Sequence, residues 1–185
     1  CGGSFLVSKE LLIPADIITM AKGFGNGAPI GAALMTSELS ESLKGKLYFN
    51  TFGGDPFQAA QARLTMEIIY DEKLIHNARE MGTRLRDDFT MMMKSRKLIG
   101  DVRGRGLLVG IELVRDRDTK EYAKVETAKL MEICMEKGIL VGKGGLFGNV
   151  IRLAPPLSIT REQCQRIVNT IDLGLGEIEK KGVGT

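Results

Sequence analysis

The stretch PADIITMAKGFGNG, residues 14–27, decides how the first half of this 185-residue chain is expected to fold. Residues 17–20 are apolar or β-branched and predict a short buried strand, because such side chains pack well on a pleated sheet. The glycine-rich residues 23–27 cannot continue the strand, so a loop is expected at its C-terminal end. Lys22 lies at that end, where the ligands of open α/β sheets gather.

Lys22 has two interpretations when the residue pattern is considered alone. A lysine that is partly desolvated at a strand end is a nucleophile that can attack a carbonyl group to form a Schiff base. The other interpretation is a solvated lysine without a chemical role. The pattern by itself favours the solvated lysine, because short motifs often arise by chance.

A second candidate segment is NTFGG, residues 50–54. Its threonine hydroxyl and the backbone N–H groups ahead of a predicted helix are typical of a phosphate site. The alternative is a plain turn that leads into the helix, with Asp55 as the N-cap and Pro56 at the first helical position. Considered alone, the segment favours the turn.

A third candidate is Arg152, which lies in the short apolar segment 150–153. An arginine within a strand needs an anionic partner, because its charge is costly to bury unpaired. Two partners are open at this point: a carboxylate of the protein itself, or the carboxylate of a substrate held by both arms of the guanidinium.

The remaining pattern predicts short strands that alternate with helices. Apolar residues at steps of three and four predict an amphipathic helix over residues 74–92. Near residues 94–98 the sequence pattern changes from long helices to short strands. Two domains are therefore expected, residues 1–96 and residues 97–185. The other expected elements are strands at 30–35, 99–102, 107–114, 139–141 and 150–153, and helices at 37–43, 56–70, 125–137 and from the capping box of Thr160 and Gln163 onward.

Composition excludes several function classes. The chain has 26 Lys and Arg against 23 Asp and Glu, a formal net charge of +3, which does not favour a nucleic-acid or membrane-surface partner. No apolar run approaches the roughly 20 residues of a membrane-spanning helix. The three cysteines have neither metal nor redox spacing, so no metal site and no disulfide framework are expected and a reducing compartment is favoured.

Four motifs, in this order along the chain, resemble the C-terminal part of the class-III (ω- or ornithine-type) pyridoxal-phosphate aminotransferases. They are PADIITMAKGFGNG (14–27), NTFGGDP (50–56), GDVRGRG (100–106) and IRLAPP (151–156). The resemblance runs from about Pro14 to about Ile178. Within the family, GKGGLFGN (142–149) is most similar to the alanine–glyoxylate aminotransferase type.

The resemblance implies a fold, a cofactor and a set of site residues. The fold is α/β: part of the large domain of a fold-type-I pyridoxal-phosphate transferase, followed by a small C-terminal α+β domain. Lys22 would bind pyridoxal 5'-phosphate as a Schiff base and act as the catalytic residue. Thr51, Phe52 and Gly53 would bind the cofactor, Thr51 by contacting the phosphate held in the neighbouring subunit of a homodimer. Arg152 would bind the substrate carboxylate.

The sequence also departs from the family pattern. Family members carry an acidic residue for the pyridine nitrogen, a phosphate loop and an aromatic residue over the ring, all upstream of the lysine. Only 21 residues precede Lys22, Asp16 does not match the acidic residue, and residues 1–10 do not match the expected glycine-rich stretch. Since the chain also begins with Cys1 and not Met, it is expected to be a fragment that lacks about half of the cofactor site.

Three functions are carried forward. The first is transfer of an amino group from an amino acid to a 2-oxo acid such as glyoxylate or pyruvate, in the complete protein. The second is an aminomutase of the same fold, which keeps the amine and moves it. The third is a non-catalytic fragment. An intracellular location is expected, either the cytoplasm or the mitochondrial matrix.

Overall fold

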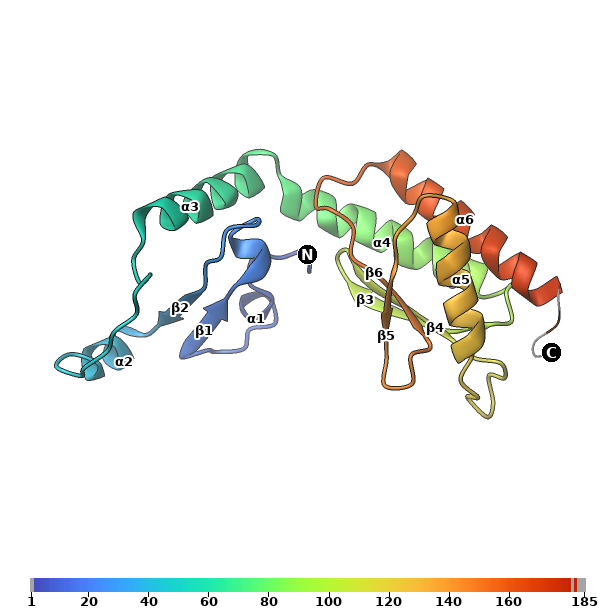
Figure 1. Cartoon of the computed structure of the whole chain (residues 1–185), viewed down its shortest axis with the longest axis horizontal. Coiled ribbons are helices and arrows are strands. Elements are labelled where there is room, and N and C mark those ends of the chain that lie inside the picture. The colour runs from blue at the N-terminus through green and yellow to red at the C-terminus, as the bar shows by residue number, and fades with distance from the viewer. Residues whose placement is uncertain (1, 181, 183–185) are drawn as a thin grey trace. The chain divides into compact units, whose positions relative to one another are not determined.

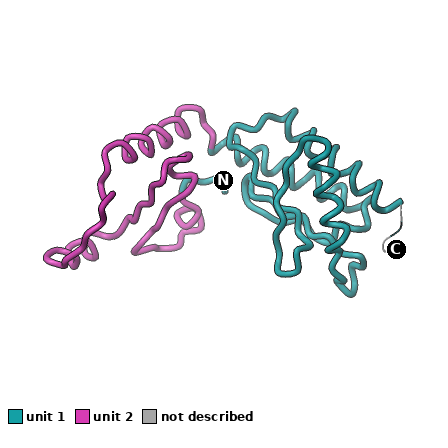
Figure 2. Tube along the Cα trace, in the orientation of Figure 1, with its two compact units in different colours: residues 1–5, 75–185 teal, residues 6–74 magenta. Residues whose placement is uncertain are grey.

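The computed structural model of the chain describes residues 2–180 and residue 182, and Cys1 lies outside this range. The elements are labelled in Figure 1. The chain forms two compact units, which Figure 2 shows in different colours. Unit 1 comprises residues 1–5 and 75–185, and unit 2 comprises residues 6–74.

Unit 1 contains an antiparallel sheet of four strands. The strands are β3 (Ile99–Arg105), β4 (Leu108–Leu113), β5 (Gly142–Gly144) and β6 (Val150–Leu153). Their order across the sheet is β3-β4-β6-β5, so β6 lies between β4 and β5 although it is the last strand in the sequence. The strands expected at 99–102, 107–114 and 150–153 are confirmed.

The strand expected at 139–141 is wrong, because these residues are used to end a helix. Helix α5 (Lys124–Glu136) stops where Gly138 adopts a left-handed conformation, with φ of 76°. The backbone N–H of Ile139 then donates to the carbonyl of Cys134 at 2.8 Å, and that of Gly138 to Met135 at 2.9 Å. This Schellman arrangement satisfies the last helical carbonyls, so strand β5 begins only at Gly142.

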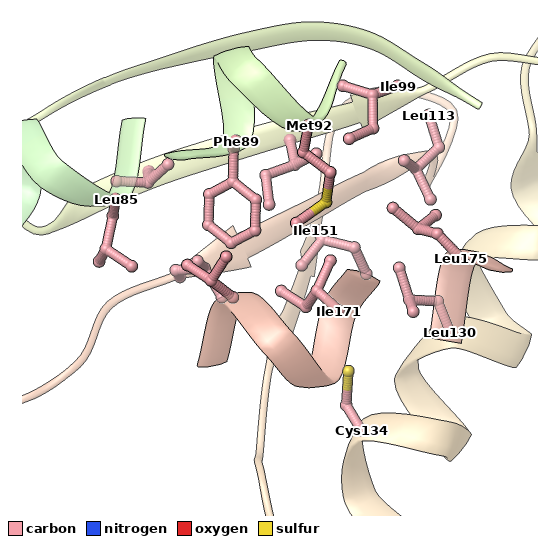
Figure 3. Close-up of a cluster of buried hydrophobic side chains, with 14 of the residues drawn as sticks. Leu85, Phe89, Met92, Ile99, Leu113, Leu130, Cys134, Ile151, Ile171 and Leu175 are labelled. Carbon is pink, nitrogen blue, oxygen red and sulfur yellow. The ribbon is translucent and has the colours of Figure 1, made fainter. Parts of the chain in front are cut away.

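One face of the sheet packs against three helices, α4 (Leu74–Met92), α5 and α6 (Arg161–Lys180). Figure 3 shows side chains of these helices meeting those of the strands in one apolar cluster. The predicted stripe of α4 is confirmed, since its members from Ala78 to Met92 are buried. The fully buried side chains include Leu85, Phe89, Ile99, Leu113, Ile151, Ile171 and Leu175.

The core of unit 1 therefore includes a helix from the N-terminal side of the expected domain boundary. Residues 96 and 97 fall inside this unit, since α4 packs in the same cluster as the sheet that follows it. The division of the complete fold into a large domain up to residue 96 and a small domain from residue 97 stays a prediction.

A close backbone approach fixes α4 against the sheet. Gly82 lies at the buried face of the helix, and a Cβ atom at this position would overlap the carbonyl group of Gly106 in the turn between β3 and β4. Neither group can give way easily, because both belong to the backbone. Glycine at position 82 is thus required by packing, although alanine is intrinsically the better helix former.

We expect Gly82→Ala to lower the free energy of unfolding by about 3 kcal/mol, because overpacking outweighs the gain of about 1 kcal/mol in helix propensity. Urea unfolding followed by far-ultraviolet circular dichroism measures the change. Thr90→Ala is the matched control, since Thr90 is exposed on the same helix, and it should change stability by less than about 0.5 kcal/mol. A more stable Gly82→Ala protein would contradict the packing argument.

Two predicted helix starts are confirmed and one is shifted by a residue. Asp55 caps α3 (Pro56–Asp71) by accepting from the N–H of Gln58 at 2.9 Å. Thr160 and Gln163 form the reciprocal capping box before α6, at 3.2 and 2.9 Å. The cap of α2 (Ser37–Ser42) is Thr36 and not Ser37, because the Thr36 hydroxyl accepts from Leu39.

Unit 2 is built from short elements and buries few residues. Strands β1 (Ile17–Met20) and β2 (Ala32–Met35) pair antiparallel, flanked by α1 (Val7–Glu10), α2 and α3. The strand expected at 17–20 is confirmed, but it is not buried: Ile17 is 55% exposed. Gly25 and Ala62 are the buried residues of this unit, so its elements lack an apolar core of their own.

The cysteines of the described chain have a packing role. Cys134 and Cys164 are free thiols that lie fully buried in the core of unit 1. Burial raises the pKa of the Cys134 thiol to about 11, so it stays protonated and unreactive at neutral pH. Among the described residues, no helix is long and apolar enough to cross a membrane, and no cluster of side chains is suited to a metal ion.

Candidate active site

Lys22 lies two residues after the end of β1, in a backbone conformation that is rare for a residue with a side chain. Its φ is +58°, in the left-handed region, and it begins a short 3-10 helix, η1 (Lys22–Phe24). The side chain is exposed. Non-glycine residues in this region cost on the order of 1 kcal/mol and are concentrated at functional sites, where the surroundings hold them in place.

The turn that carries Lys22 is fixed from two sides. The N–H of Gly25 donates to the carbonyl of Lys22 at 3.0 Å, and Gln61 of α3 donates through Nε2 to the carbonyl of Gly25, also at 3.0 Å. A Cβ at residue 25 would lie only 2.6 Å from the Ile30 Cγ2 atom and would overlap the carbonyl of Ala28. The glycine-rich loop expected after the strand is therefore a turn that is tightly packed at Gly25, while Gly23 and Gly27 face open space.

The second candidate segment, residues 50–54, forms the turn that leads into α3. The Asn50 side chain accepts from the N–H of Phe52 at 3.1 Å, and its backbone carbonyl accepts from Gly53 at 2.9 Å. Thr51, Phe52 and Gly53 are all exposed, with the Thr51 hydroxyl on the surface of unit 2. No hydrogen bond among the described residues joins this turn to Lys22. The phosphate role of Thr51 stays a prediction.

Arg152 lies in unit 1, on the face of the sheet opposite the three helices. We call this face, which carries Arg103, Gly110, Glu112, Arg152 and Gly142, the outer face. Arg152 is exposed, and no carboxylate of the described residues pairs with it. Of the two partners left open by the sequence, the structure does not supply the protein carboxylate.

Arg152 also lines a pocket of about 520 Å³. Its walls are the segment 138–142, the segment 152–156 and the first turns of α6. The polar side chains there are those of Arg152, Arg166 and Gln163, and no carboxylate contributes. Arg166 donates through Nη2 to the carbonyl of Lys137 at 3.1 Å. Arg152 has no such partner among the described residues, so a lining with arginines and no acid favours an anionic ligand.

Glycines flank Arg152 on both neighbouring strands. The residue pairs with Gly110 of β4 on one side and with Gly142 of β5 on the other. Its guanidinium lies over Gly142, where a Cβ would be 3.1 Å from Nε and 3.4 Å from Nη2. Sequence reasoning missed Gly142 and the pocket residue Arg166, because the order of the strands cannot be deduced from periodicity.

Comparison with known proteins shows the family of the chain. A sequence model of the family described as "Aminotransferase class-III" matches residues 1–175 of the chain. The chain belongs to the class-III aminotransferase family. The resemblance seen in the four motifs is confirmed, and contrary to expectation residues 1–10 also fall inside the match.

A curated relative and solved structures that are similar to the chain are also aminotransferases. Alanine–glyoxylate aminotransferase 2 homolog 2, mitochondrial, from Arabidopsis thaliana is 43% identical over 176 residues, which cover 95% of this chain and 37% of that protein. An aminotransferase structure from Bacillus anthracis matches 96% of this chain and 42% of its own, with a TM-score of 0.89 and 35% identity. The mixed α/β fold expected from the sequence is thus confirmed.

A further structure is of an amine transaminase from an uncultivated Pseudomonas species in its PLP-bound form. It superposes with a TM-score of 0.86 at 26% identity, and the match covers 95% of this chain and 41% of that one. The present chain therefore spans about two fifths of the length of these proteins that it matches.

Proposed function

We propose that the complete protein transfers an amino group from an amino acid to a 2-oxo acid, glyoxylate or pyruvate, with pyridoxal 5'-phosphate bound by Lys22 as a Schiff base. The observation that carries this proposal is the strained Lys22 backbone at the end of β1, inside a class-III match over residues 1–175. A backbone held in this way fixes the point from which the lysine side chain starts.

The residues present fit this cofactor. The Lys22 amine is exposed at the end of a short strand and is able to reach an aldehyde, and the Thr51 hydroxyl is exposed for a phosphate. Phe52 and Gly53 complete the predicted cofactor set. Pyridoxal phosphate, when bound, supplies an electron sink for the negative charge that develops at the amino acid Cα. Lys22 then serves as the base that removes a proton from that carbon and returns one during transfer.

Arg152 is assigned to the carboxylate of the amino acid and the 2-oxo acid. The guanidinium presents two parallel N–H donors that match the two oxygens of a carboxylate. It has no carboxylate partner among the described residues, and its pocket holds a second arginine and no acid. The anion that Arg152 requires is therefore expected to come from the substrate.

The proposal includes a homodimer, with Thr51 contacting the phosphate held by the partner. Its support is the apolar surface around that residue. Large apolar side chains gather between residues 47 and 57 and are strongly exposed, with Leu47 fully exposed, Phe49 85% exposed and Phe57 80% exposed. A soluble protein rarely leaves such a stretch bare, which makes it a suitable subunit interface.

Two measurements test the function against its alternatives. The full-length protein, incubated with an amino acid and glyoxylate or pyruvate, should release one 2-oxo acid for every amino acid formed. An aminomutase would isomerise the amino acid without consuming a separate acceptor. The non-catalytic alternative applies to the 185-residue chain by itself, for which we expect little bound cofactor; stoichiometric binding and turnover by that chain would contradict this. An intracellular location, cytoplasmic or mitochondrial, stays part of the proposal.

The position of the Arg152 guanidinium over Gly142 gives a prediction for the full-length enzyme. Gly142→Ala adds a Cβ against the guanidinium and should raise KM for the amino acid roughly fivefold with little change in kcat, because a positioned charge-assisted pair is displaced. Steady-state kinetics measure both constants. Gly144→Ala is the matched control on the same strand and face, since its Cβ would lie 4.0 Å from the Arg152 Cβ. Equal effects of the two substitutions would contradict a specific role of Gly142 in positioning the Arg152 guanidinium.

A further inference from the structure

The outer face of the sheet carries two arginines in very different surroundings. The register places Arg103 of β3, Gly110 of β4, Arg152 of β6 and Gly142 of β5 in one row across the four strands. Because residues in one row point to the same side, both guanidinium groups rise from the same face, separated by a residue without a side chain.

Arg103 is paired with two carboxylates through a single nitrogen, Nη1. Its Nη1 atom lies 2.6 Å from an oxygen of Asp101 and 2.5 Å from an oxygen of Glu112. These hydrogen bonds, first that to Asp101 and then that to Glu112, raise the pKa of Arg103 above its ordinary value. Asp101 and Glu112 are directly opposite each other in the register, where two like charges repel unless a cation bridges them.

Glu112 is also within reach of Arg152 and is the carboxylate that would form an ion pair with it. Glu112 pairs with Val150 and Gly110 pairs with Arg152, so Glu112 is a diagonal neighbour of Arg152 on the outer face. It is a diagonal neighbour of Arg103 by the same register. Diagonal neighbours are about 7–8 Å apart at the backbone, within reach of side chains as long as glutamate and arginine.

The structure resolves this competition in favour of Arg103. Glu112 points one oxygen to Arg103, while its other oxygen is 3.5 Å from Nδ2 of the buried Asn149. Arg152 leans the other way, over Gly142. Arg105 is a further arginine of this face. In the strand register it lies opposite Leu108, which is four residues from Glu112 along β4, so Arg105 is poorly placed to replace Arg103 as the partner of Glu112.

We infer that Arg103 is a positioning residue: it binds Glu112 and Asp101 so that Arg152 stays unneutralised and free for the carboxylate of an amino or 2-oxo acid. The identity of that ligand rests on the proposed function. The transfer of Glu112 from Arg103 to Arg152 does not depend on it. Without Arg103, Glu112 would face Asp101 unpaired, and Arg152 is the cation that a diagonal contact offers it.

The test compares three variants of the full-length holoenzyme. Arg103→Gln should raise KM for the amino acid about tenfold with kcat within about twofold, because the substrate must now displace an internal carboxylate from a charge-assisted pair. Adding Glu112→Gln to this variant should bring KM back to within about threefold of wild type. Arg103→Lys keeps the charge and one pairing arm, and its KM should lie between those of wild type and Arg103→Gln.

A second readout does not depend on the substrate. Phenylglyoxal modifies accessible guanidinium groups, and peptide mass spectrometry reports the rate at Arg152. Arg103→Gln should slow this rate severalfold by pairing Arg152, and the double variant should restore it. Unchanged labelling in Arg103→Gln, or the same KM in the single and double variants, would overturn the inference. Slower labelling with unchanged KM would support the ion-pair exchange and instead contradict the assignment of Arg152 to the substrate.

Discussion

Lys22→Ala should abolish the visible absorption band of the full-length protein with pyridoxal phosphate and lower the transamination rate by at least about a thousandfold. The band arises from covalent attachment of the cofactor to an amine, and the same amine moves the proton at the substrate carbon. Borohydride reduction of the wild-type protein should add the mass of the cofactor to the peptide that contains Lys22, and no such peptide should arise from the variant.

The chain offers a well-matched control for this substitution. Lys73 is also a lysine of unit 2 with a left-handed backbone, with φ of 54°, but it lies in the turn after α3 and not at a strand end. Lys73→Ala should keep both the band and the turnover. If Lys22→Ala retains the band, the assignment of the cofactor lysine is wrong, whatever the family of the chain.

Arg152→Lys should raise KM for the amino acid by about ten- to a hundredfold while leaving cofactor binding intact. Lysine keeps the positive charge but replaces the planar guanidinium, with its two parallel N–H donors, by a single ammonium group. The rise in KM therefore measures the contribution of the two-donor geometry. Steady-state kinetics and absorption titration with pyridoxal phosphate separate the two effects.

The control for Arg152 is a change of substrate. An amine donor that lacks the carboxylate has nothing to offer the guanidinium, so its KM should respond little to Arg152→Lys. Equal losses of amino-acid use and of cofactor binding would make Arg152 a structural residue. Equal losses with both kinds of donor would show that the pocket recognises something other than the acid.

Local chemistry made much of the fold predictable. Asp55 with Pro56, and Thr160 with Gln163, mark helix starts through hydrogen bonds to the next few N–H groups, which depend only on nearby residues. The stripe of α4 follows from the 3.6-residue period. The failure at 139–141 has the same local origin, since its apolar residues have strand character but the first of them closes the end of α5.

The candidate site was predictable only in part, for a physical reason. Lys22, Thr51 and Arg152 carry distinctive functional groups, and their motifs identify them one at a time. The roles of Gly142 and Arg103 depend on which strands are neighbours and in what register. That order places β6 between β4 and β5, a long-range arrangement that neither composition nor periodicity encodes.

Gly110 has no side chain and lies between Arg103 and Arg152, so the outer face is open between the two guanidinium groups. This position is therefore suited to enzyme engineering. A Cβ there would lie 3.4 Å from the nearest Val150 methyl carbon, an ordinary contact, so alanine fits without moving the backbone. It would place a new group directly beside Arg152. On the proposed role of Arg152, a substitution at Gly110 should therefore change the preference among acids without altering Arg152 itself.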